Sequence, residues 1–392
     1  MSSQKKLFRL TTIPLSLHKL LRNQLKFVSS YYTVLAISSP GELMQEVSEN
    51  EGVETIAIPM TRAITPVADL KALWKLYRLF KKEKPLIVHT HTPKAGLLGM
   101  MAAWGAGVPV RMHTVAGLPL LEATGTKRRI LNVVEKITYS CANKVYPNSF
   151  RLREIIVTEK FCKPSKVTVI GNGSSNGIDT DYFSADQVLD TTQQLLRTEL
   201  GIQPDDTVLC FVGRMVADKG INELVAAFTD LSTRHPAIKL ILTGPFENDL
   251  DPLHPSTEAL IKTHPSIKWV GYQNDVRPYL AISHVFVFPS YREGFPNVVM
   301  QAGAMGLPCI VSNINGCNEI IEHNLNGLIV EPKDGQALKI AMENLVVHTE
   351  VRQQMAANSR EVIVTRYRQE YLWNELLKEY KRMEQQVLQP PS

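Results

Sequence analysis

The chain has 392 residues, of which 44% are hydrophobic and 21% are charged, and its formal net charge is +5. This length corresponds to two or three domains, each large enough to bury a hydrophobic core. The composition excludes a disordered chain, collagen and a disulfide scaffold, and an excess of five positive charges is too small to indicate nucleic-acid binding.

The five cysteines and the N-terminus bear on the cellular compartment. The cysteines contain no CxxC and no paired spacing typical of a zinc or redox site, so we expect reduced thiols in a cytosolic protein. The N-terminal segment lacks the apolar core and cleavage site of a signal peptide, and export is not expected. The longest uncharged stretch, residues 95–110, is shorter than the roughly 18 apolar residues that span a bilayer, and it predicts a close-packed buried helix.

Short β-rich runs alternate with segments of helical period along most of the chain. This alternation is typical of parallel sheets that are covered by helices on both faces. Seven strands are predicted in the first half, at residues 6–12, 32–38, 54–60, 86–91, 108–114, 144–147 and 166–171. Six more are predicted at residues 208–213, 239–244, 267–271, 285–289, 309–312 and 328–330. From residue 336 to about residue 386 the pattern is almost wholly helical, so the last helices must pack on elements that precede them.

A Gly/Ser/Asn-rich segment, residues 171–179 (GNGSSNGID), separates the two series of strands and predicts a domain boundary. The charge is divided unequally at this segment. Residues 1–179 contain 25 Lys/Arg and 12 Asp/Glu, a net charge of +13, whereas residues 180–392 contain 18 and 26, a net charge of −8. The total of +5 therefore hides a strongly polarised molecule.

Much of the positive charge of the first half lies on predicted helices. One of them carries four basic residues at helical spacing, with an apolar stripe opposite them. The basic residues are Lys71, Lys75, Arg78 and Lys82, and the apolar ones are Leu70, Leu73, Trp74, Tyr77 and Phe80. Two further basic clusters lie at residues 19–26 and 127–129. Each cluster alone is typical of a solvated helix face, but three in one domain favour a surface that meets anionic lipid.

The segment VGRMVADKGINELVAAF, residues 212–228, has the composition of a phosphate site. A predicted strand ends at Gly213, the following loop carries Arg214 and Lys219, and Gly220 begins an apolar-periodic helix. The free N–H groups of a helix N-terminus, together with an Arg and a Lys, can bind a phosphate or diphosphate. A basic surface loop is the alternative for this segment taken alone.

A second segment, residues 290–321, makes that alternative much weaker. Glu293 follows the buried strand VFVFP, and Gly294 allows the backbone to approach a ligand closely. A helix then begins at Phe295-Pro296, at the edge where open α/β sheets bind ligands. A carboxylate at this position can accept hydrogen bonds from sugar hydroxyls.

At these residues the sequence resembles the retaining GT-B glycosyltransferases of family 4, over nearly its whole length. That family carries a G-R-x4-K-G segment, matched here by Gly213, Arg214, Lys219 and Gly220, whose Arg and Lys hold the donor diphosphate. It also carries an E-x7-E segment that begins E-G-F-P, and the resemblance implies that Glu293 contacts the donor sugar hydroxyls.

The rest of the E-G-F-P segment is implied to hold the donor as well. Gly294, Phe295 and Pro296 supply backbone contacts in this resemblance. The second Glu of the motif, which grips the nucleotide ribose in the family, is replaced by Gln301, whose amide can still hydrogen-bond both ribose hydroxyls. Tyr272, just after the strand IKWVG, stands where the family reads the base.

The resemblance implies a GT-B fold, an α/β architecture of two Rossmann-like doubly wound domains that face a cleft. We expect an N-terminal acceptor-binding domain at residues 1–172, with a C-terminal helix at about residues 365–386 that crosses back to it. The C-terminal nucleotide-sugar domain is expected at residues 173–364. Retaining transfer in this family needs no protein nucleophile and no metal, so we expect no cofactor. Asp249 and Asp251 form a D-x-D, but they lie in a Pro-rich segment that predicts a solvated loop.

The first half departs more from the family pattern. Ala116, in HTVAGLP, occupies the place of a family His that reaches the donor sugar, and His113 is either its substitute or a core histidine. In VHTHTPKAG, two His without a third ligand make a weak metal site. We instead expect His91 and Lys94 to lie near an anionic acceptor.

The sequence therefore predicts a glycosyltransferase on the cytoplasmic face of the cell membrane. We expect it to move a sugar, an N-acetylhexosamine, from a UDP-sugar donor to a polyprenyl-diphosphate-linked sugar of a capsule, O-antigen or related glycan. An NAD-dependent oxidoreductase is disfavoured, because the chain has no G-x-G-x-x-G. A nucleotide-sugar epimerase on the same fold and a non-catalytic partner in polysaccharide assembly stay open as alternatives.

Overall fold

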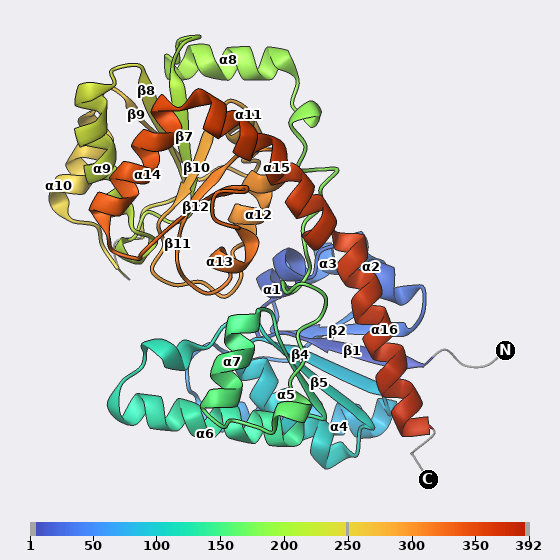
Figure 1. Ribbon diagram of the computed structural model, residues 1–392. Helices are drawn as coiled ribbons and strands as arrows, with labels where there is room; N and C mark the ends of the chain where they lie inside the picture. Colours follow the sequence, from blue (N-terminus) through green and yellow to red (C-terminus); the bar gives the residue numbers. More distant parts are fainter. Residues whose placement is uncertain (1–4, 248–250, 389–392) are drawn as a thin grey trace. The chain divides into compact units, whose positions relative to one another are not determined.

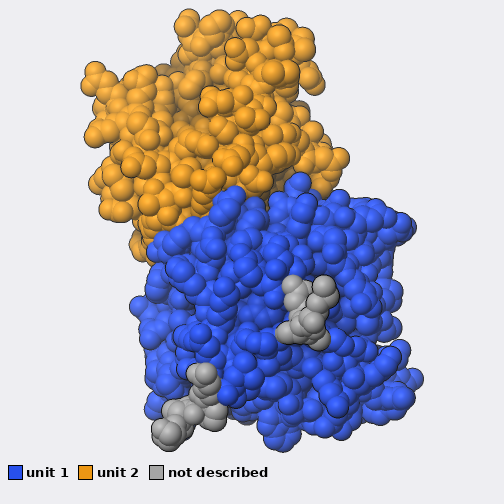
Figure 2. Space-filling view, turned by 90° about the vertical axis from the view of Figure 1, so that its right-hand side faces the viewer, with its two compact units in different colours: residues 1–176, 369–392 blue, residues 177–368 orange. Residues whose placement is uncertain are grey.

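A computed structural model describes residues 5–247 and 251–388 of the chain. The chain forms two compact units, one of residues 1–176 together with 369–392 and one of residues 177–368 (Figures 1 and 2). Each unit contains a six-stranded parallel sheet with helices on both of its faces (Figure 1). The predicted doubly wound α/β architecture is thus confirmed for both halves of the chain.

In unit 1 the strand order is β3-β2-β1-β4-β5-β6. Its strands are β1 (Lys6–Leu10), β2 (Thr33–Ser38), β3 (Glu54–Ala57), β4 (Ile87–His91), β5 (Val110–Val115) and β6 (Lys144–Pro147). Its α-helices are α1 (Pro14–Leu20), α2 (Gln24–Ser29), α3 (Leu43–Glu51), α4 (Pro66–Glu83), α5 (Pro93–Ala106), α6 (Gly125–Cys141), α7 (Phe150–Thr158) and α16 (Gln369–Leu388). Two short 3-10 turns, Pro119–Glu122 and Pro164–Lys166, complete it.

Unit 2 has the strand order β12-β11-β10-β7-β8-β9. Its strands are β7 (Thr207–Val212), β8 (Ile238–Thr243), β9 (Ile267–Gly271), β10 (Val285–Phe288), β11 (Cys309–Ser312) and β12 (Gly327–Val330). Its α-helices are α8 (Asp190–Leu200), α9 (Ile221–Arg234), α10 (Pro255–Thr263), α11 (Arg277–Ala281), α12 (Asn297–Ala304), α13 (Cys317–Ile320), α14 (Gly335–Val347) and α15 (Thr349–Tyr367). The 3-10 turns are Ala185–Gln187 and Ala217–Lys219.

The two sheets share one topology, and this topology indicates at which edge of each sheet a ligand would bind. Counted along its own unit, each sheet has the order 3-2-1-4-5-6, so the direction of winding reverses between the first and fourth strands. These strands are β1 and β4 in unit 1 and β7 and β10 in unit 2. Open α/β sheets bind ligands beyond the carboxyl ends of the strands at this reversal.

The C-terminal helix α16 belongs to the core of unit 1, although its sequence follows unit 2. Leu376, Leu377 and Tyr380 are buried there, in one cluster with residues of α1, α2 and β2. The predicted return of the last helix to the first domain is therefore confirmed. The apolar side of α16 covers part of one face of the unit 1 sheet, which the helices of residues 1–176 do not cover completely.

Twelve of the thirteen predicted strands form, and the one at residues 166–171 does not. Val167 makes a single parallel bridge to Val145 at the edge of the sheet. Pro164 begins a 3-10 turn just before it, and the chain leaves the edge directly afterwards. Residues 166–171 therefore do not extend the sheet as a seventh strand, because only Val167 pairs with the edge strand β6.

Most of the uncharged stretch at residues 95–110 forms the close-packed helix that the sequence predicts, as α5, which ends at Ala106, while Val110 already belongs to β5. A Cβ atom on Gly99 would lie 2.4 Å from Leu10 Cδ2, so the absence of a side chain lets α5 approach the sheet closely. Within residues 5–247 and 251–388, none of the helices combines the length and the apolarity required to cross a bilayer.

Candidate active site

The first part of the site is the loop that follows β7. Gly244, at φ +142°, packs so closely on this loop that a Cβ atom would lie 1.8 Å from the Gly213 carbonyl oxygen. Arg214 follows, and its Nη1 atom donates to Glu247 Oε2 at 2.7 Å. This hydrogen bond raises the pKa of Arg214, so its positive charge is retained at every physiological pH.

The second part joins the loop to the end of β10. Gly220, at φ +69°, stands directly before α9, and a Cβ atom on it would lie 2.2 Å from the Pro289 carbonyl oxygen. This contact brings Lys219 and Glu293 together: Lys219 Nζ lies 2.6 Å from Glu293 Oε1. The two side chains are only 12% and 17% exposed. Ser290 Oγ donates to the same carboxylate oxygen at 3.1 Å.

A second set of contacts holds the loop in place. The Asp218 carboxylate accepts from Arg292 Nε at 2.8 Å and from Arg292 Nη2 at 2.7 Å. The backbone N–H of Asp218 donates to Asp251 Oδ2 at 2.6 Å. Asp251 thus anchors the loop rather than projecting into solvent, while its D-x-D partner Asp249 lies outside the described residues. No group of three or more His, Cys, Asp or Glu suited to a metal ion occurs in the part of the chain that the structure describes.

The third part is the E-G-F-P turn before α12. The Phe295 ring is buried against Tyr367, with ring centroids 5.5 Å apart, so only its backbone is available to a ligand. Asn315 Nδ2 donates to the Glu293 carbonyl oxygen at 3.1 Å. Gly316, at φ +76°, approaches Gly294 so closely that a Cβ atom would lie 2.7 Å from its carbonyl oxygen. The turn is therefore fixed from the segment that follows β11.

Three further residues that were predicted to bind the donor lie around this turn and along the sheet. Pro296 directly precedes the first residue of α12. Gln301 is part of α12 and is half-buried. Tyr272 follows β9, and its side chain is 64% exposed, so its ring is available to stack on a planar ligand.

In unit 1 the three residues predicted on the acceptor side have different surroundings. His91, at the end of β4, is buried and lies 2.8 Å from Arg9 Nη2. Lys94 Nζ donates to Asp69 at 2.5 Å and to the Ala63 carbonyl oxygen at 2.6 Å, so two of its three N–H donors are used within the unit. His113 is a core residue, 2.8 Å from Thr90 Oγ1, and burial lowers its pKa to about 4.

Sequence reasoning missed the groups that orient these residues. Glu247 is 33 positions from Arg214, to which it bonds. Ser290 and Asn315, which bond the Glu293 carboxylate and carbonyl oxygen, lie on loops where no sequence spacing indicates a role. In unit 1, Arg9 and Tyr380 were also missed. Arg9 had a usable signal, because a charged residue inside the apolar strand KLFRL must find polar partners in the core.

Comparisons with known proteins agree with this geometry. The family "Glycosyl transferases group 1" matches residues 192–362, and "Glycosyl transferase 4-like domain" matches residues 28–173. The capsular polysaccharide biosynthesis glycosyltransferase CapM of Staphylococcus aureus is 34% identical over 373 residues, which cover 95% of this chain and 96% of CapM. The chain belongs to the group 1 glycosyltransferases.

Other relatives of this glycosyltransferase support the assignment. The Escherichia coli UDP-Gal:alpha-D-GlcNAc-diphosphoundecaprenol alpha-1,3-galactosyltransferase is 32% identical over 325 residues, 80% of each chain. Among solved structures, a glycosyltransferase of Rickettsia africae gives a TM-score of 0.80 at 18% identity, over 100% of both chains. Anabaena Alr3699/HepE in complex with UDP gives 0.79 at 17% identity, over 96% of this chain and 100% of that chain. The fold is therefore GT-B, and the enzyme belongs to a family of retaining hexosyltransferases.

Proposed function

We propose that this glycosyltransferase moves a sugar, an N-acetylhexosamine, from a UDP-sugar to a polyprenyl-diphosphate-linked saccharide during synthesis of a capsule or related surface glycan. The observation that carries the proposal is the Lys219–Glu293 pair at the β7/β10 reversal of the sheet. It places a cation for a diphosphate beside a carboxylate for sugar hydroxyls. The E. coli relative, by its name, uses UDP-Gal and a diphosphoundecaprenol-linked sugar.

In this mechanism the protein positions the reactants and stabilises charge. Arg214, Lys219 and the N-terminus of α9 neutralise the departing diphosphate. Glu293 holds the donor sugar hydroxyls, and the backbone at Gly213, Gly220, Gly294, Phe295 and Pro296 allows close approach. The acceptor hydroxyl attacks the anomeric carbon on the face that the diphosphate leaves, and its proton passes to a donor phosphate oxygen. No metal and no protein nucleophile are required.

The nucleoside end is assigned to two further residues. Gln301 hydrogen-bonds the ribose hydroxyls through its amide, which lacks the charge-assisted strength of a carboxylate. Tyr272 stacks on the base. Both assignments rest on the resemblance to the family: Gln301 stands at the second Glu position of the E-x7-E motif, and Tyr272 follows β9, where the family reads the base.

A membrane-facing surface on unit 1 fits a lipid-linked acceptor. An apolar helix stripe normally packs on the core, yet Leu70 and Trp74 of α4 are 66% and 57% exposed, and Ala72, Leu76 and Phe80 are buried instead. The exposed stripe runs beside Lys71, Lys75, Arg78 and Lys82. This combination of aromatic and basic side chains is typical of helices that lie in a membrane interface.

The same surface continues over α5 and α6, because α5 packs against both α4 and α6. A Cβ atom on Gly105 of α5 would lie 3.7 Å from the Tyr77 ring of α4, and the neighbouring Trp104 is 64% exposed. On α6, Ile130, Val133 and Ile137 are exposed at helical spacing. We assign this face of unit 1 to the anionic cytoplasmic leaflet, where a peripheral enzyme meets its acceptor.

A substrate panel tests the proposed function. The enzyme is incubated with UDP- and GDP-sugars and short-chain polyprenyl-diphosphate sugars, and the anomeric configuration of the product is determined by NMR. We expect an α-linked product from a UDP-N-acetylhexosamine. An epimerised UDP-sugar formed without any acceptor would instead identify an epimerase, and the absence of UDP binding in calorimetry would identify a non-catalytic partner.

A further inference from the structure

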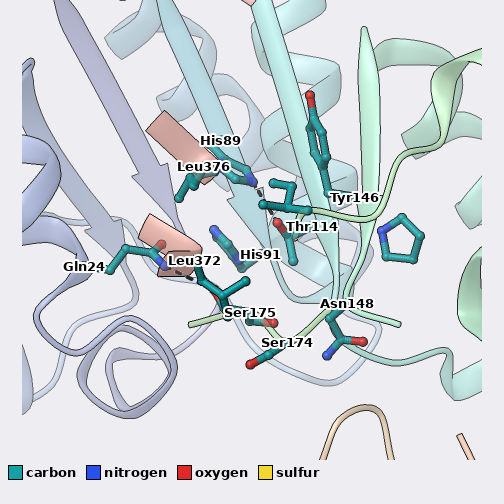
Figure 3. Close-up of a pocket in the computed structure, with 12 residues that line it drawn as sticks. Gln24, His89, His91, Thr114, Tyr146, Asn148, Ser174, Ser175, Leu372 and Leu376 are labelled. Atoms are coloured by element: carbon teal, nitrogen blue, oxygen red, sulfur yellow. Dashed lines mark hydrogen bonds between the residues drawn. The ribbon is translucent and has the colours of Figure 1, made fainter. Parts of the chain in front are cut away.

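A small cavity lies in unit 1 beyond the carboxyl ends of β4 and β5 (Figure 3). Its volume is about 20 Å³, the space of one water molecule or one hydroxyl group. Side chains from separate elements surround it, and several of them are polar (Figure 3). Its lining consists of Gln24, His89, His91, Thr114, Tyr146, Pro147, Asn148, Ile170, Ser174, Ser175, Leu372 and Leu376.

A fully buried guanidinium lies behind this lining. Arg9 of β1 is 0% exposed, and its hydrogen bonds go to Tyr380 Oη, Gln24 Oε1 and His91 Nε2, all on neutral groups. An Arg side chain can only donate hydrogen bonds and keeps its protons at every physiological pH. Arg9 therefore fixes the direction of each hydrogen-bond chain that begins at it.

The first chain reaches the cavity through His91. Arg9 Nη2 donates to His91 Nε2 at 2.8 Å, so this nitrogen must be the acceptor. A neutral imidazole then carries its proton on Nδ1. Burial, and secondarily the charge of Arg9, lowers the pKa of His91 well below its usual value and keeps the ring neutral. His91 thus offers one N–H donor from a ring that lines the cavity.

The second chain runs through Tyr380 of the C-terminal helix. The Tyr380 hydroxyl accepts from Arg9 Nη1, which cannot accept in return, and it lies 2.6 Å from His89 Nδ1. We therefore assign the hydroxyl proton to the bond with His89. His89 then carries its proton on Nε2 and donates to Thr114 Oγ1 at 2.8 Å (Figure 3). The Thr114 hydroxyl, which accepts this bond, is left with its proton to donate.

An acceptor completes the set of polar groups. Asn148 is buried and lines the cavity, and its Oδ1 atom has no hydrogen-bond partner among the described residues. An unpaired buried carbonyl oxygen is costly unless a ligand or water satisfies it. The residues that line the cavity therefore include two donors, on His91 and Thr114, and one unpaired acceptor, on Asn148.

We propose that this cavity binds one hydroxyl group of the acceptor saccharide, with His91, Thr114 and Asn148 as binding residues and Arg9 and Tyr380 as positioning residues. A hydroxyl can accept from the two donors and donate to the Asn148 oxygen, whereas a phosphate group is too large for a space of about 20 Å³. Leu372, Leu376 and Ile170 supply apolar contact beside it. The inference rests on the proposed function, since it names the saccharide as ligand.

Steady-state kinetics of matched variants test the proposal. Thr114→Val removes the donor and keeps the shape, and Tyr380→Phe interrupts the second chain. We expect each to raise KM for a short-chain polyprenyl-diphosphate N-acetylhexosamine by about 3- to 10-fold, the effect of one or two neutral hydrogen bonds. KM for the UDP-sugar should not change, and Thr114→Ser should restore the wild-type value. Tyr32→Phe is the control, because the Tyr32 hydroxyl contacts Glu384 on the same helix and lies outside both chains.

A binding measurement keeps this inference separate from the proposed function. Saturation-transfer NMR with methyl N-acetyl-α-hexosaminides, in the presence of UDP, needs no turnover. Binding of the glycoside to the wild type, and its loss in Thr114→Val, support the proposal that the cavity binds a saccharide hydroxyl. This result would hold even if the proposed polyprenyl-diphosphate acceptor were not the substrate. Unchanged acceptor KM and unchanged glycoside binding in Thr114→Val would overturn it, as would displacement of the glycoside by inorganic phosphate.

Discussion

Lys219 Nζ and Glu293 Oε1, 74 positions apart in the sequence, lie 2.6 Å from each other. The cation that we propose for the diphosphate and the carboxylate that we propose for the sugar therefore pair with one another in this structure. Their pairing keeps both side chains in place before the donor binds, so little side-chain entropy is lost when it arrives.

Replacing Lys219 by Ala should lower kcat by about 100-fold or more, because one preorganised charge on the leaving group is removed in a partly buried site. Arg214→Ala should have a similar effect. Turnover of the UDP-sugar is measured by UDP release. Lys262→Ala is the matched control, since Lys262 pairs with Glu258 on the surface of the same unit. Near-normal rates in both site variants would refute the site assignment.

Gln301→Glu should strengthen UDP binding by about 3- to 10-fold, because a carboxylate makes charge-assisted hydrogen bonds to the ribose hydroxyls. Gln301→Ala should weaken it. Isothermal titration calorimetry with UDP measures both affinities. If neither substitution changes the affinity, Gln301 does not contact the ribose.

Gly220→Ala should destabilise unit 2 far more than Gly201→Ala does. Both glycines have positive φ, +69° and +65°, but only at Gly220 would the new Cβ meet the backbone, 2.2 Å from the Pro289 oxygen. The conformational penalty alone is about 1 kcal/mol, and the overlap should bring the loss at Gly220 above about 3 kcal/mol. Urea unfolding of the two variants compares these costs. Equal losses would mean that the loop after β7 can move away from β10.

Binding to anionic vesicles should depend on α4. The double variant Trp74→Ala/Tyr77→Ala should bind phosphatidylglycerol vesicles about 10-fold more weakly than the wild type in a sedimentation assay. Its stability should fall only slightly, because Trp74 is mostly exposed and Tyr77 is partly exposed. Leu195→Ala on α8, also exposed, is the control. Wild-type binding should fall at high salt. Binding that survives high salt, or that resides in residues 177–368, contradicts the assigned face.

Acid should destabilise unit 1 through its buried histidines. Burial lowers the pKa of His113 to about 4, below the ordinary value of 6.5 that a histidine has in an unfolded chain. The unfolded state therefore binds more protons, and the stabilisation present above pH 6.5 is lost as the pH falls toward 4. His113 alone should cost about 2 kcal/mol at pH 5. Urea unfolding at pH 7 and pH 5 measures the loss, which should be smaller in His113→Gln; equal losses would show that His113 already titrates normally.

Much of the geometry of the proposed donor site could be predicted, because its residues lie in two short segments of the sequence. Arg214, Lys219 and Gly220 occupy one loop, and Glu293 begins one turn, so the strand-loop-helix pattern alone places them at the carboxyl edge of a parallel sheet. The contact between Lys219 and Glu293, and the support of that pair by Ser290, required the sheet, because β7 and β10 become neighbours only through the fold.

The sequence by itself determined the two parallel sheets, the donor motifs and the uneven charge, since each depends on local periodicity or composition. Only the tertiary structure decided which stripe of α4 is buried, because that depends on what packs against the helix. It alone also joined Arg9 to Tyr380 across 371 positions. A buried charge takes whatever polar partners the core offers, and no local pattern records where along the chain they lie.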